Sequence, residues 1–489
     1  MYTEKMQMET TFTFDDVLLE PAESWVEPDE ADVRSRFSRS IPLNLPLVSA
    51  AMDTVTESVM AITMAREGGI GVIHRNMPPE REVAEVRVVK QAEDLIEREV
   101  VAVGPKATVT DVERVMRQYG IGGVPVIEDD RVIGIVSRRD IRAILPKRGE
   151  AKITEYMTRK LITASEDITA ENALETMYAN KVERLPVVDA KGCLVGIITM
   201  RDILEKRQYP RANRDANGKL RVAAAVGPFD FNRAMMLVES GVDALVVDCA
   251  HGHNMNVVNA VREIKASVVA VDVVAGNIAT KQAASTLIDT VDGLKVGIGP
   301  GSICTTRIVA GVGVPQVSAI ANVAEVAHEA GVPVVADGGI RYSGDIAKAI
   351  AAGADCIMAG SLFAGTDEAP GRVTTIKGRR YKQYRGMGSL GVMSSGESSD
   401  RYFQKKEIGR TKFVPEGVEG VTPYVGRVSD VIYQLVGGLK SAMGYTGSKT
   451  IADLKKNGRF LRITPAGYGE SHPHNIMITD EAPNYRLFE

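Results

Sequence analysis

A chain of 489 residues exceeds what one hydrophobic core usually holds, so its length predicts two or three domains. With 44% hydrophobic and 25% charged residues the composition is that of a globular protein, and a net charge of −4 offers no general attraction to nucleic acid or an anionic membrane. The N-terminal residues lack the pattern of a signal peptide, which favours the cytoplasm. The four cysteines are widely spread, which fits neither a disulfide framework nor a zinc site.

Short apolar runs at 46–49 and 69–73 begin a series of predicted strands, which continues at 221–226, 244–248, 268–272, 294–298, 333–336 and 356–359. Helical patterns alternate with them at 58–67, 233–240, 255–266, 281–287, 319–330 and 344–352. Eight such units predict an α/β fold, a (β/α)8 TIM barrel whose site lies at the C-terminal ends of the strands. A doubly wound sheet is the alternative, but no GxGxxG opens a helix after the first strand. We expect residues 1–92 and 209–489 to form this catalytic domain around an insertion at 93–208.

The insertion carries an internal repeat, at about 97–149 and 157–205. Met116 matches Met177 and Pro125 matches Pro186, each pair 61 positions apart. Each copy predicts a helix, two strands and the start of a second helix, and two adjacent copies should pack as one module.

The repeat resembles a tandem pair of CBS domains, a fold that commonly senses adenine nucleotides. The resemblance implies that Asp140 and Asp202 bind ribose hydroxyls. The same residues can instead complete capping boxes with Ser137 and Thr199, and the sequence leaves both interpretations open.

The loop KVGIGPGSICTTR, residues 295–307, places Cys304 directly after a predicted strand. Its glycines allow a ligand to approach the backbone closely, and the hydroxyls and Arg307 beside the thiol favour the nucleophilic thiolate. The alternative is that Cys304 is a small buried hydrophobic residue. Its position in a loop at a strand end favours the nucleophile.

Phosphate often binds in TIM barrels at the loops after strands seven and eight. Here those loops hold Asp337-Gly338-Gly339 and Gly360-Ser361. Either glycine motif alone would suggest a tight turn, but both at the expected places favour a nucleoside monophosphate, with Ser302 as a further donor and Asp337 on the ribose.

Residues 374–423 depart from barrel periodicity, and such a long segment is typical of a lid or flap. Its basic run at 377–385 predicts a solvated loop face rather than a nucleic-acid site. Arg401 and Tyr402 within it are suited to delivering water to a covalent intermediate.

Longer motifs carry a closer resemblance. They are PLVSAAMDTVTE, GGIGVIHRNM, DCAHGHN, AGNIAT, GIGPGSICTTR, ADGGIR, AGSLFAG, YRGMGSLG, DRYFQ and AGYGESHPHNI. Along essentially its whole length the chain resembles the inosine 5′-monophosphate (IMP) dehydrogenase family. The resemblance implies NAD-dependent oxidation of IMP to xanthosine 5′-monophosphate (XMP), the committed step of guanine nucleotide synthesis, through a covalent thioimidate on Cys304.

The resemblance also implies the other site residues. Hydrolysis of the thioimidate falls to Arg401, Tyr402 and Thr306. The substrate contacts are Ser302, Asp337, Gly339, Gly360, Ser361, Tyr384, Gly386, Met387, Gly388 and Glu416, and the NAD contacts are Asp248, Asn277, Gly297 and Gly299. A monovalent cation, K⁺, is implied at Gly299, Gly301 and Cys304 together with Glu470, Ser471 and His472 of a neighbouring subunit, hence a homotetramer.

Two other readings remain open. A guanosine 5′-monophosphate (GMP) reductase shares the barrel and the cysteine loop, but the family resemblance implies that it typically lacks the CBS pair and the Arg-Tyr flap, both of which this chain has. A non-catalytic CBS nucleotide sensor would have no need of Cys304, Thr306, Arg401 and Tyr402, all of which this chain has. At the CBS pair either an adenine or a guanine nucleotide is possible.

Overall fold

The computed structural model describes residues 8–395, 401 and 413–485. The chain separates into two compact units, one made of Met1–Ala92 with Arg211–Glu489 and the other of Glu93–Pro210. Each unit is described by itself. Among the residues described, no helix has the length and apolar character needed to cross a membrane.

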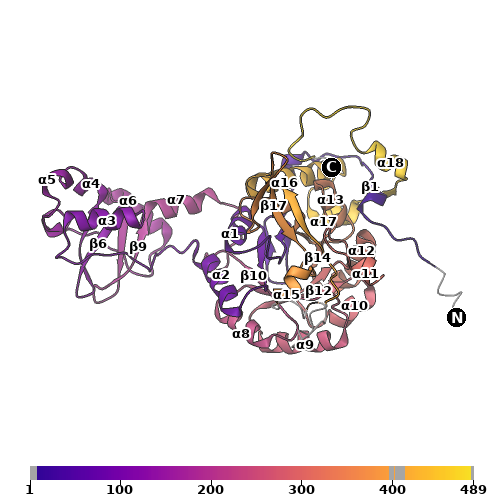
Figure 1. Cartoon of the computed structure of the whole chain (residues 1–489), viewed down its shortest axis with the longest axis horizontal. Coiled ribbons are helices and arrows are strands. Elements are labelled where there is room, and N and C mark those ends of the chain that lie inside the picture. Colours follow the sequence, from indigo (N-terminus) through magenta and orange to yellow (C-terminus); the bar gives the residue numbers. More distant parts are fainter. Residues whose placement is uncertain (1–7, 396–400, 402–412, 486–489) are drawn as a thin grey trace. The chain divides into compact units, whose positions relative to one another are not determined.

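The first unit contains a closed barrel of eight parallel strands, which confirms the predicted TIM barrel (Figure 1). In spatial order the strands are β10 (Ala223–Val226), β11 (Ala244–Asp248), β12 (Asp272–Ile278), β13 (Gly293–Val296), β14 (Val334–Asp337), β15 (Cys356–Ala359), β4 (Leu47–Ser49) and β5 (Ile70–Ile73). The chain leaves this series after the second strand, β5, and rejoins it at the third, β10. The strand interiors are rich in Val, Ile and Ala, as strands covered on both faces require.

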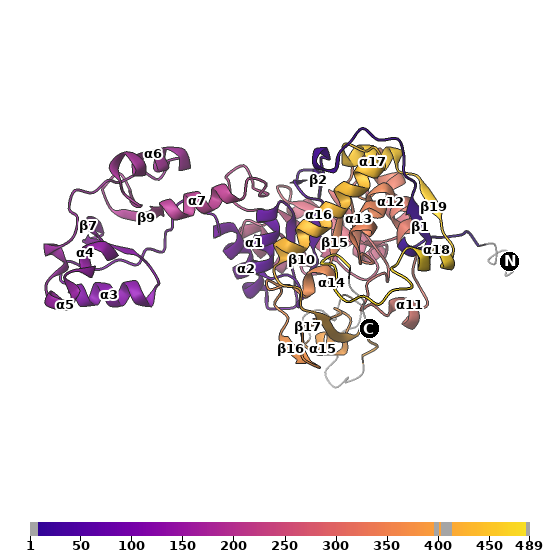
Figure 2. The same ribbon diagram turned by 90° about the horizontal axis from the view of Figure 1, so that it is seen from above.

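Helices surround the strands (Figures 1 and 2). They include α1 (Ser58–Glu67), α2 (Pro79–Gln91), α8 (Phe231–Glu239), α9 (Met255–Ser267), α10 (Lys281–Leu287), α12 (Gln316–Glu329), α13 (Ser343–Ala351) and α16 (Val428–Tyr445). Local signals set their ends: the Asp230 side chain caps α8, Thr280 caps α10, and Gly68 ends α1 in the left-handed region with φ of 106°.

The predicted fifth strand, 268–272, is wrong in position, because the strand is β12, Asp272–Ile278. Helix α9 continues to Ser267, and the Val271 amide closes a turn on the Val268 carbonyl, so the apolar residues 268–271 form a turn. Val269 is 81% exposed there. A run of valines does not show where the helix ends and the strand begins, because valine fits the end of either element. The strand as observed includes Asn277, whereas the prediction placed Asn277 after the strand.

Residues 374–423 are not one long loop either. β16 (Val373–Ile376), β17 (Arg379–Arg385) and β18 (Glu419–Pro423) form a separate antiparallel sheet, and α15 (Leu390–Ser395) follows β17 (Figure 2). The basic run 377–385 lies largely in β17 and alternates between the two faces of this sheet. Lys382 is therefore buried, and its ammonium donates to the carbonyls of Thr366 and Ala369, so the prediction of a solvated face is wrong for this residue. Arg379 and Arg380, at the start of the strand, are exposed.

The second unit has the repeated order expected from the sequence. The first copy holds α3 (Val109–Gln118), β6 (Gly123–Glu128), β7 (Arg131–Ser137) and α4 (Arg138–Arg142), and the second holds α6 (Ala170–Asn180), β8 (Arg184–Val188), β9 (Leu194–Thr199) and α7 (Met200–Gln208). Met116 and Met177, which the sequence matches, are buried in two separate apolar clusters, one per copy.

The remaining elements are short. They are β1 (Val17–Leu19), paired with β19 (Phe460–Arg462), then β2 (Ser35–Arg36), β3 (Pro42–Leu43), α5 (Leu145–Arg148), α11 (Thr306–Val309), α14 (Ser361–Ala364), α17 (Ile451–Asn457) and α18 (Pro465–Glu470).

The close approach of α1 to β5 yields a stability prediction. A Cβ on Gly71 would lie 2.6 Å from the Ala61 Cα, so Gly71→Ala should lower the free energy of unfolding by about 1–3 kcal/mol. Gly437, exposed inside α16, has open space around its Cβ position, so Gly437→Ala should instead stabilise by about 1 kcal/mol. Denaturant unfolding of both variants checks this, and equal effects would contradict the packing argument.

Candidate functional site

A pocket lies where the barrel strands end at their carboxyl termini. Its lining includes residues that end or follow six of the eight strands, among them Met52, Asp248, Asn277, Gly297 and Gly360. Most of the site residues predicted from the sequence line it: Cys304, Thr306, Arg401, Asp337, Gly360, Tyr384, Gly386, Met387, Gly388, Glu416, Asp248, Asn277, Gly297, Gly299 and Gly301. Residues as far apart in sequence as Ala50 and Gly417 thus meet around one thiol.

Cys304 sits in a tightly held loop after β13. Its amide donates to the Gly301 carbonyl at 3.0 Å, and its thiol donates to the Thr306 hydroxyl at 3.2 Å. The Arg307 guanidinium joins the two ends of the loop, donating to the carbonyls of Ile298 at 3.0 Å and Val314 at 2.6 Å. Gly299 has a φ of 77°, and a Cβ there would meet the Arg307 side chain at 2.6 Å, so this position requires glycine.

A buried lysine lies beneath the pocket. The Lys295 ammonium donates to Asp248 Oδ1 at 2.8 Å, to Asp337 Oδ2 at 2.7 Å and to the Asn277 side-chain oxygen. Asn277 in turn donates to Asp337 Oδ2 at 2.9 Å. The ammonium therefore joins Asp337, the predicted ribose ligand of the substrate, to Asp248 and Asn277, two of the four predicted NAD residues.

The charges around Asp248 keep it ionised. Burial by itself would raise the pKa of Asp248, but Arg401 and Lys295 outweigh that effect and lower the pKa to about 2. The next residue differs, because burial and the Asp248 carboxylate together raise the pKa of the Cys249 thiol to about 11. Cys249 is thus an unreactive thiol in the pocket that holds Cys304.

Arg401 reaches the pocket from the segment after α15. Its guanidinium contacts Asp248 in an ion pair, and its carbonyl accepts a hydrogen bond from the Ala250 amide at 3.1 Å. Tyr402, predicted to act with it, lies outside the described residues. The structure therefore brings Arg401, Thr306 and Cys304 together in one pocket, as the sequence predicted.

The predicted purine-binding residues come from outside the barrel and are bonded to the cysteine loop. The Thr305 amide donates to the Glu416 carbonyl at 2.9 Å, and the Val418 amide donates to the Ile303 carbonyl at 3.0 Å. The same strand-like segment pairs on its other side with Gly386 and Gly388, again at 3.0 Å. Backbone hydrogen bonds thus fix the distance between the thiol and the loop that follows β17.

Three predicted phosphate residues, Ser302, Gly339 and Ser361, are each adjacent in sequence to a lining residue rather than part of the lining. Ser361 begins α14, whose N-cap is Gly360. Tyr384 is buried, and burial raises the pKa of its hydroxyl, an effect that a hydrogen bond with Ser302 partly offsets. Gly339 has a φ of 84° and lies against Pro300 of the cysteine loop.

The predicted cation ligands fall into two groups. Gly299, Gly301 and Cys304 line the pocket and offer backbone carbonyls, the neutral oxygen donors that suit a hard monovalent ion. Glu470, Ser471 and His472 lie at the end of α18 and do not line the pocket of this chain. There the Ser471 hydroxyl donates to the Gly467 carbonyl, and His472 contacts the Tyr485 hydroxyl at 2.9 Å.

In the second unit, both predicted ribose ligands cap helices. Asp140 Oδ2 accepts from the Ser137 amide at 2.7 Å and from its hydroxyl at 2.8 Å, while Asp202 Oδ2 accepts from the Thr199 hydroxyl at 2.6 Å. In each case these contacts go to Oδ2, so capping does not prevent Oδ1 from accepting a ribose hydroxyl. A separate cavity in the first copy is lined by Arg117, Arg138 and Arg142, among others.

Sequence reasoning missed Lys295 and the ion pair between Asp53 and Arg385. Lys295 lies inside the predicted strand 294–298, and a lysine inside a barrel strand is itself a signal of a buried counter-charge. For Asp53 and Arg385 the signal is weaker, because 332 positions separate them and nothing local pairs them.

Comparison with known proteins gives one consistent result. A family model described as the IMP dehydrogenase / GMP reductase domain matches residues 11–474. Inosine-5′-monophosphate dehydrogenases from Methanocaldococcus jannaschii and Halobacterium salinarum are 55% and 56% identical to this chain, covering 100% and 99% of it and 100% and 97% of their own lengths.

A solved structure of a GMP reductase from Trypanosoma brucei in complex with guanosine 5′-monophosphate superposes with a TM-score of 0.87 at 40% identity, covering 97% of this chain and 100% of its own. A GMP reductase can therefore extend across residues 93–208. This corrects the expectation that the inserted unit distinguishes the two enzymes.

The contacts of Lys295 generate a prediction. Lys295→Met would leave the buried Asp248 and the half-buried Asp337 without their ammonium, and breaking a buried ion pair on one side costs about 3–5 kcal/mol of unfolding free energy. Lys281→Met, which breaks the exposed pair with Glu325, is the matched control and should cost far less. Urea unfolding of both variants measures the difference.

The pH dependence has a definite sign. The folded pKa of Asp248, about 2, lies below its unfolded value, so its ion pairs contribute stability at neutral pH that is lost as the pH falls from about 4 through about 2. The stability gap between the native protein and Lys295→Met should shrink over that window. A gap that stays constant would show that the charge on Asp248 is not its cause.

Proposed function

Since this chain belongs to the IMP dehydrogenase / GMP reductase family, we propose that the pocket around Cys304 carries out the reaction of its full-length relatives. The chain oxidises IMP to XMP, and NAD⁺ accepts the hydride. One observation supports this pocket as the site: Cys304 shares it with the Asp337 carboxylate, the loop after β17 and Asp248, which are suited to ribose, purine and cofactor.

Cys304 is the nucleophile. Its thiol releases its proton to water and the sulfur forms a bond to C2 of the hypoxanthine ring. The hydride on C2 is then lost to NAD⁺, and a thioimidate between enzyme and nucleotide remains. Water then adds to C2 and the thiol departs with a proton, which yields XMP and the free enzyme. The hydrogen bond from the thiol to Thr306 holds the sulfur toward the pocket before reaction.

Arg401, with Tyr402 and Thr306, activates that water. An arginine side chain is normally too basic to accept a proton, so Thr306, which contacts the cysteine, shares the work. Arg401 now pairs with Asp248, the same carboxylate proposed to bind the nicotinamide ribose. The cofactor and Arg401 therefore use Asp248 in turn, so hydride transfer and hydrolysis occur in sequence.

The nucleotide is held from two sides. Phosphate is bound by amides and hydroxyls of Ser302, Gly339, Gly360, Ser361 and Tyr384, and the ribose hydroxyls by Asp337. The purine edge meets Gly386, Met387, Gly388 and Glu416. The support is that loops after β14, β15 and β17 converge on the cysteine loop, where glycine at Gly338 and Gly339 lets the backbone approach a ligand.

The cofactor is bound by Asp248, Asn277, Gly297 and Gly299. The ionised Asp248 carboxylate is a strong acceptor for ribose hydroxyls, and it faces the pocket beside Cys304, so the residues fit this group. K⁺ fits the carbonyls of Gly299, Gly301 and Cys304. Glu470, Ser471 and His472 of a neighbouring subunit complete its shell in a homotetramer.

The inserted unit binds an adenine or guanine nucleotide. The support is a cavity with three arginines, which suits phosphate, and the position of Asp140 on the adjoining helix start. Equilibrium dialysis of the full chain against ATP and GTP tests this binding.

GMP reduction is the second candidate, because a GMP reductase superposes on nearly the whole chain. The relatives above 50% identity favour IMP oxidation. Comparing NADH formation from IMP and NAD⁺ with NADPH consumption in the presence of GMP separates the two. Turnover only with GMP and NADPH would overturn the assignment.

Cys304→Ala should lower turnover of IMP by at least about a thousandfold while leaving IMP binding intact, because the covalent step is lost. Cys193→Ala, which changes a cysteine in the other unit, is the control and should keep full activity. Steady-state NADH formation and IMP binding measure the two effects. Normal turnover of Cys304→Ala would exclude this nucleophile.

Arg401→Ala should form about one NADH per site and then stall, because only hydrolysis of the thioimidate is impaired. Rapid mixing of the enzyme with IMP and NAD⁺ detects the burst, and mass spectrometry of the stalled enzyme should find the purine adduct on Cys304. The absence of a burst, with slow but linear NADH formation, would show that Arg401 acts before or during hydride transfer.

A further inference from the structure

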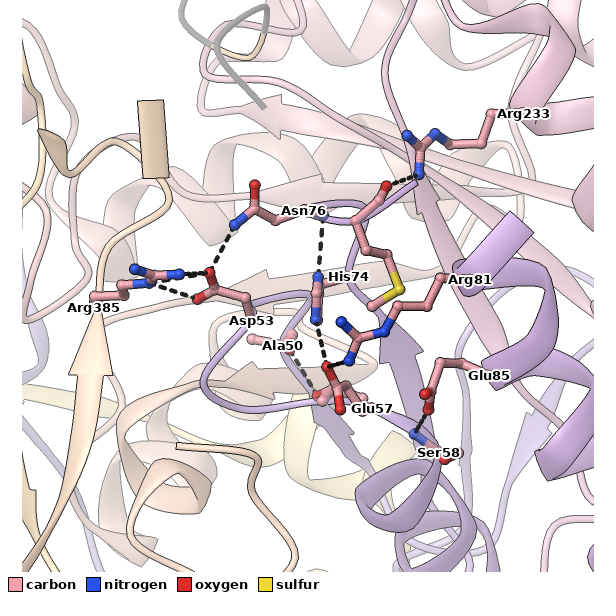
Figure 3. A network of polar contacts seen from close by, with 12 residues as sticks. Ala50, Asp53, Glu57, Ser58, His74, Asn76, Arg81, Glu85, Arg233 and Arg385 are labelled. Carbon is pink, nitrogen blue, oxygen red and sulfur yellow. Dashed lines mark hydrogen bonds and ion pairs between the residues drawn. The ribbon is translucent and has the colours of Figure 1, made fainter. Parts of the chain in front are cut away.

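Figure 3 shows a polar network in which Arg385 contacts a loop of the barrel. Arg385 is the last residue of β17, a strand that belongs to the three-stranded sheet and not to the barrel. Its neighbours in sequence are Tyr384 on one side and Gly386 on the other, both in the pocket. Whatever holds Arg385 therefore also holds the segment proposed to contact the phosphate and the purine.

The partner of Arg385 is Asp53, in the loop after β4. Arg385 Nε lies 3.2 and 3.0 Å from the two Asp53 oxygens, and a terminal guanidinium nitrogen lies 2.5 Å from Oδ2. The Asp53 side chain is 7% exposed and that of Arg385 27% exposed, so the carboxylate is buried while the guanidinium is partly open. A planar guanidinium meeting both oxygens of a carboxylate fixes orientation as well as distance. The Arg385 amide adds a contact to the Thr54 hydroxyl at 3.4 Å.

Asp53 is itself held by the loop after β5. The Asn76 side chain donates to Asp53 Oδ2 at 2.7 Å, and the Asn76 amide donates to His74 Nδ1 at 3.1 Å. His74 Nε2 lies 3.4 Å from Glu57 Oε1, which also accepts from Arg81 (Figure 3). Residues of two barrel loops therefore hold the Asp53 carboxylate in the position from which it contacts Arg385.

On its other side, the loop after β17 is anchored to the cysteine loop. Gly386 and Gly388 pair with residues 416–418, which in turn pair with Ile303 and Thr305. The segment 384–388 is consequently fixed at two places, to the thiol's own loop by backbone hydrogen bonds and to the barrel by one side-chain ion pair.

We propose that the Asp53–Arg385 ion pair positions the nucleotide-binding segment 384–388 over the barrel, and so sets the affinity for IMP without taking part in the chemistry. The proposal rests on the proposed function, since it assumes that this segment contacts IMP. Both residues are positioning residues: they act through Tyr384 and the loop that follows it.

The test compares the full-chain variants Asp53→Asn, Arg385→Met, their double variant and Arg385→Lys. Asp53→Asn and Arg385→Met should each raise KM for IMP on the order of tenfold, the size expected when one of two interacting side chains is removed. Each should change kcat much less. The double variant should be no worse than the worse single variant, because both remove the same interaction. Arg385→Lys should lie between native and Arg385→Met, because lysine keeps the charge and loses the two-point contact.

Arg379→Met is the matched control, since Arg379 lies at the exposed start of the same strand. It should leave KM and kcat unchanged. A second readout is independent of turnover: IMP should protect Cys304 from alkylation at higher concentrations in the Asp53→Asn and Arg385→Met variants than in the native protein. Circular dichroism confirms which variants are folded, and Asp53→Asn, which retains an acceptor for Asn76, is the mildest of them.

Unchanged KM and protection in folded variants, or effects of the two single changes that add in the double variant, would overturn the proposal. If the native protein forms XMP and these variants behave like it, the positioning role of the ion pair is rejected and the proposed function is not affected. A native protein that forms no XMP from IMP would instead reject the function on which the proposal rests.

Discussion

The ammonium of Lys295 is buried inside the barrel, where water cannot solvate it, and its two carboxylate partners make its charge tolerable. Asp248 and Asp337 come from strands on either side of β13, and Asn277 completes the shell. Each partner alone would be costly to bury, and together they hold one another in fixed orientations. The consequence is a rigid floor of the pocket, which presents one carboxylate to each of the two proposed ribose sites.

Asp248 has a further constraint, because it meets Lys295 through one oxygen and Arg401 through the other. The lysine contact is internal to the barrel. The arginine contact comes from the segment after α15, so the proposed ribose hydroxyl can replace it while the carboxylate keeps its lysine partner. Because Asp248 keeps Lys295 as one partner, exchanging its second partner costs little free energy. This suits the proposed reaction, in which hydride transfer and hydrolysis need different groups at the same place.

The residues between β13 and α11, which include Cys304, form no helix or strand of their own. Arg307 closes its ends, and residues 416–418 bind it like an added strand. The thiol is therefore presented by a segment fixed from both the barrel and the outer sheet. That arrangement also explains why the three-stranded sheet matters to the site, because the residues between β17 and β18 carry the proposed purine contacts.

Much of this could be predicted from residues in sequence order. The alternation of apolar runs and helical patterns determined the barrel and the place of the insertion, because both depend on local periodicity. The glycine loop around Cys304 and the acidic strand ends at Asp248 and Asp337 were visible for the same reason. Where a pattern was ambiguous, as in the valines at 268–274, the strand was misplaced, and the charged strand β17 was taken for a solvated loop.

The ion pairs across the site could not be predicted from local sequence patterns. That Lys295 joins Asp248 to Asp337, that Arg401 meets Asp248, and that Arg385 meets Asp53 each depend on how distant strand ends come together in the closed barrel. Local sequence specifies which elements form, because short-range backbone and solvation energies act within a few residues. Which charges neutralise one another is settled only when the chain folds and removes those charges from water.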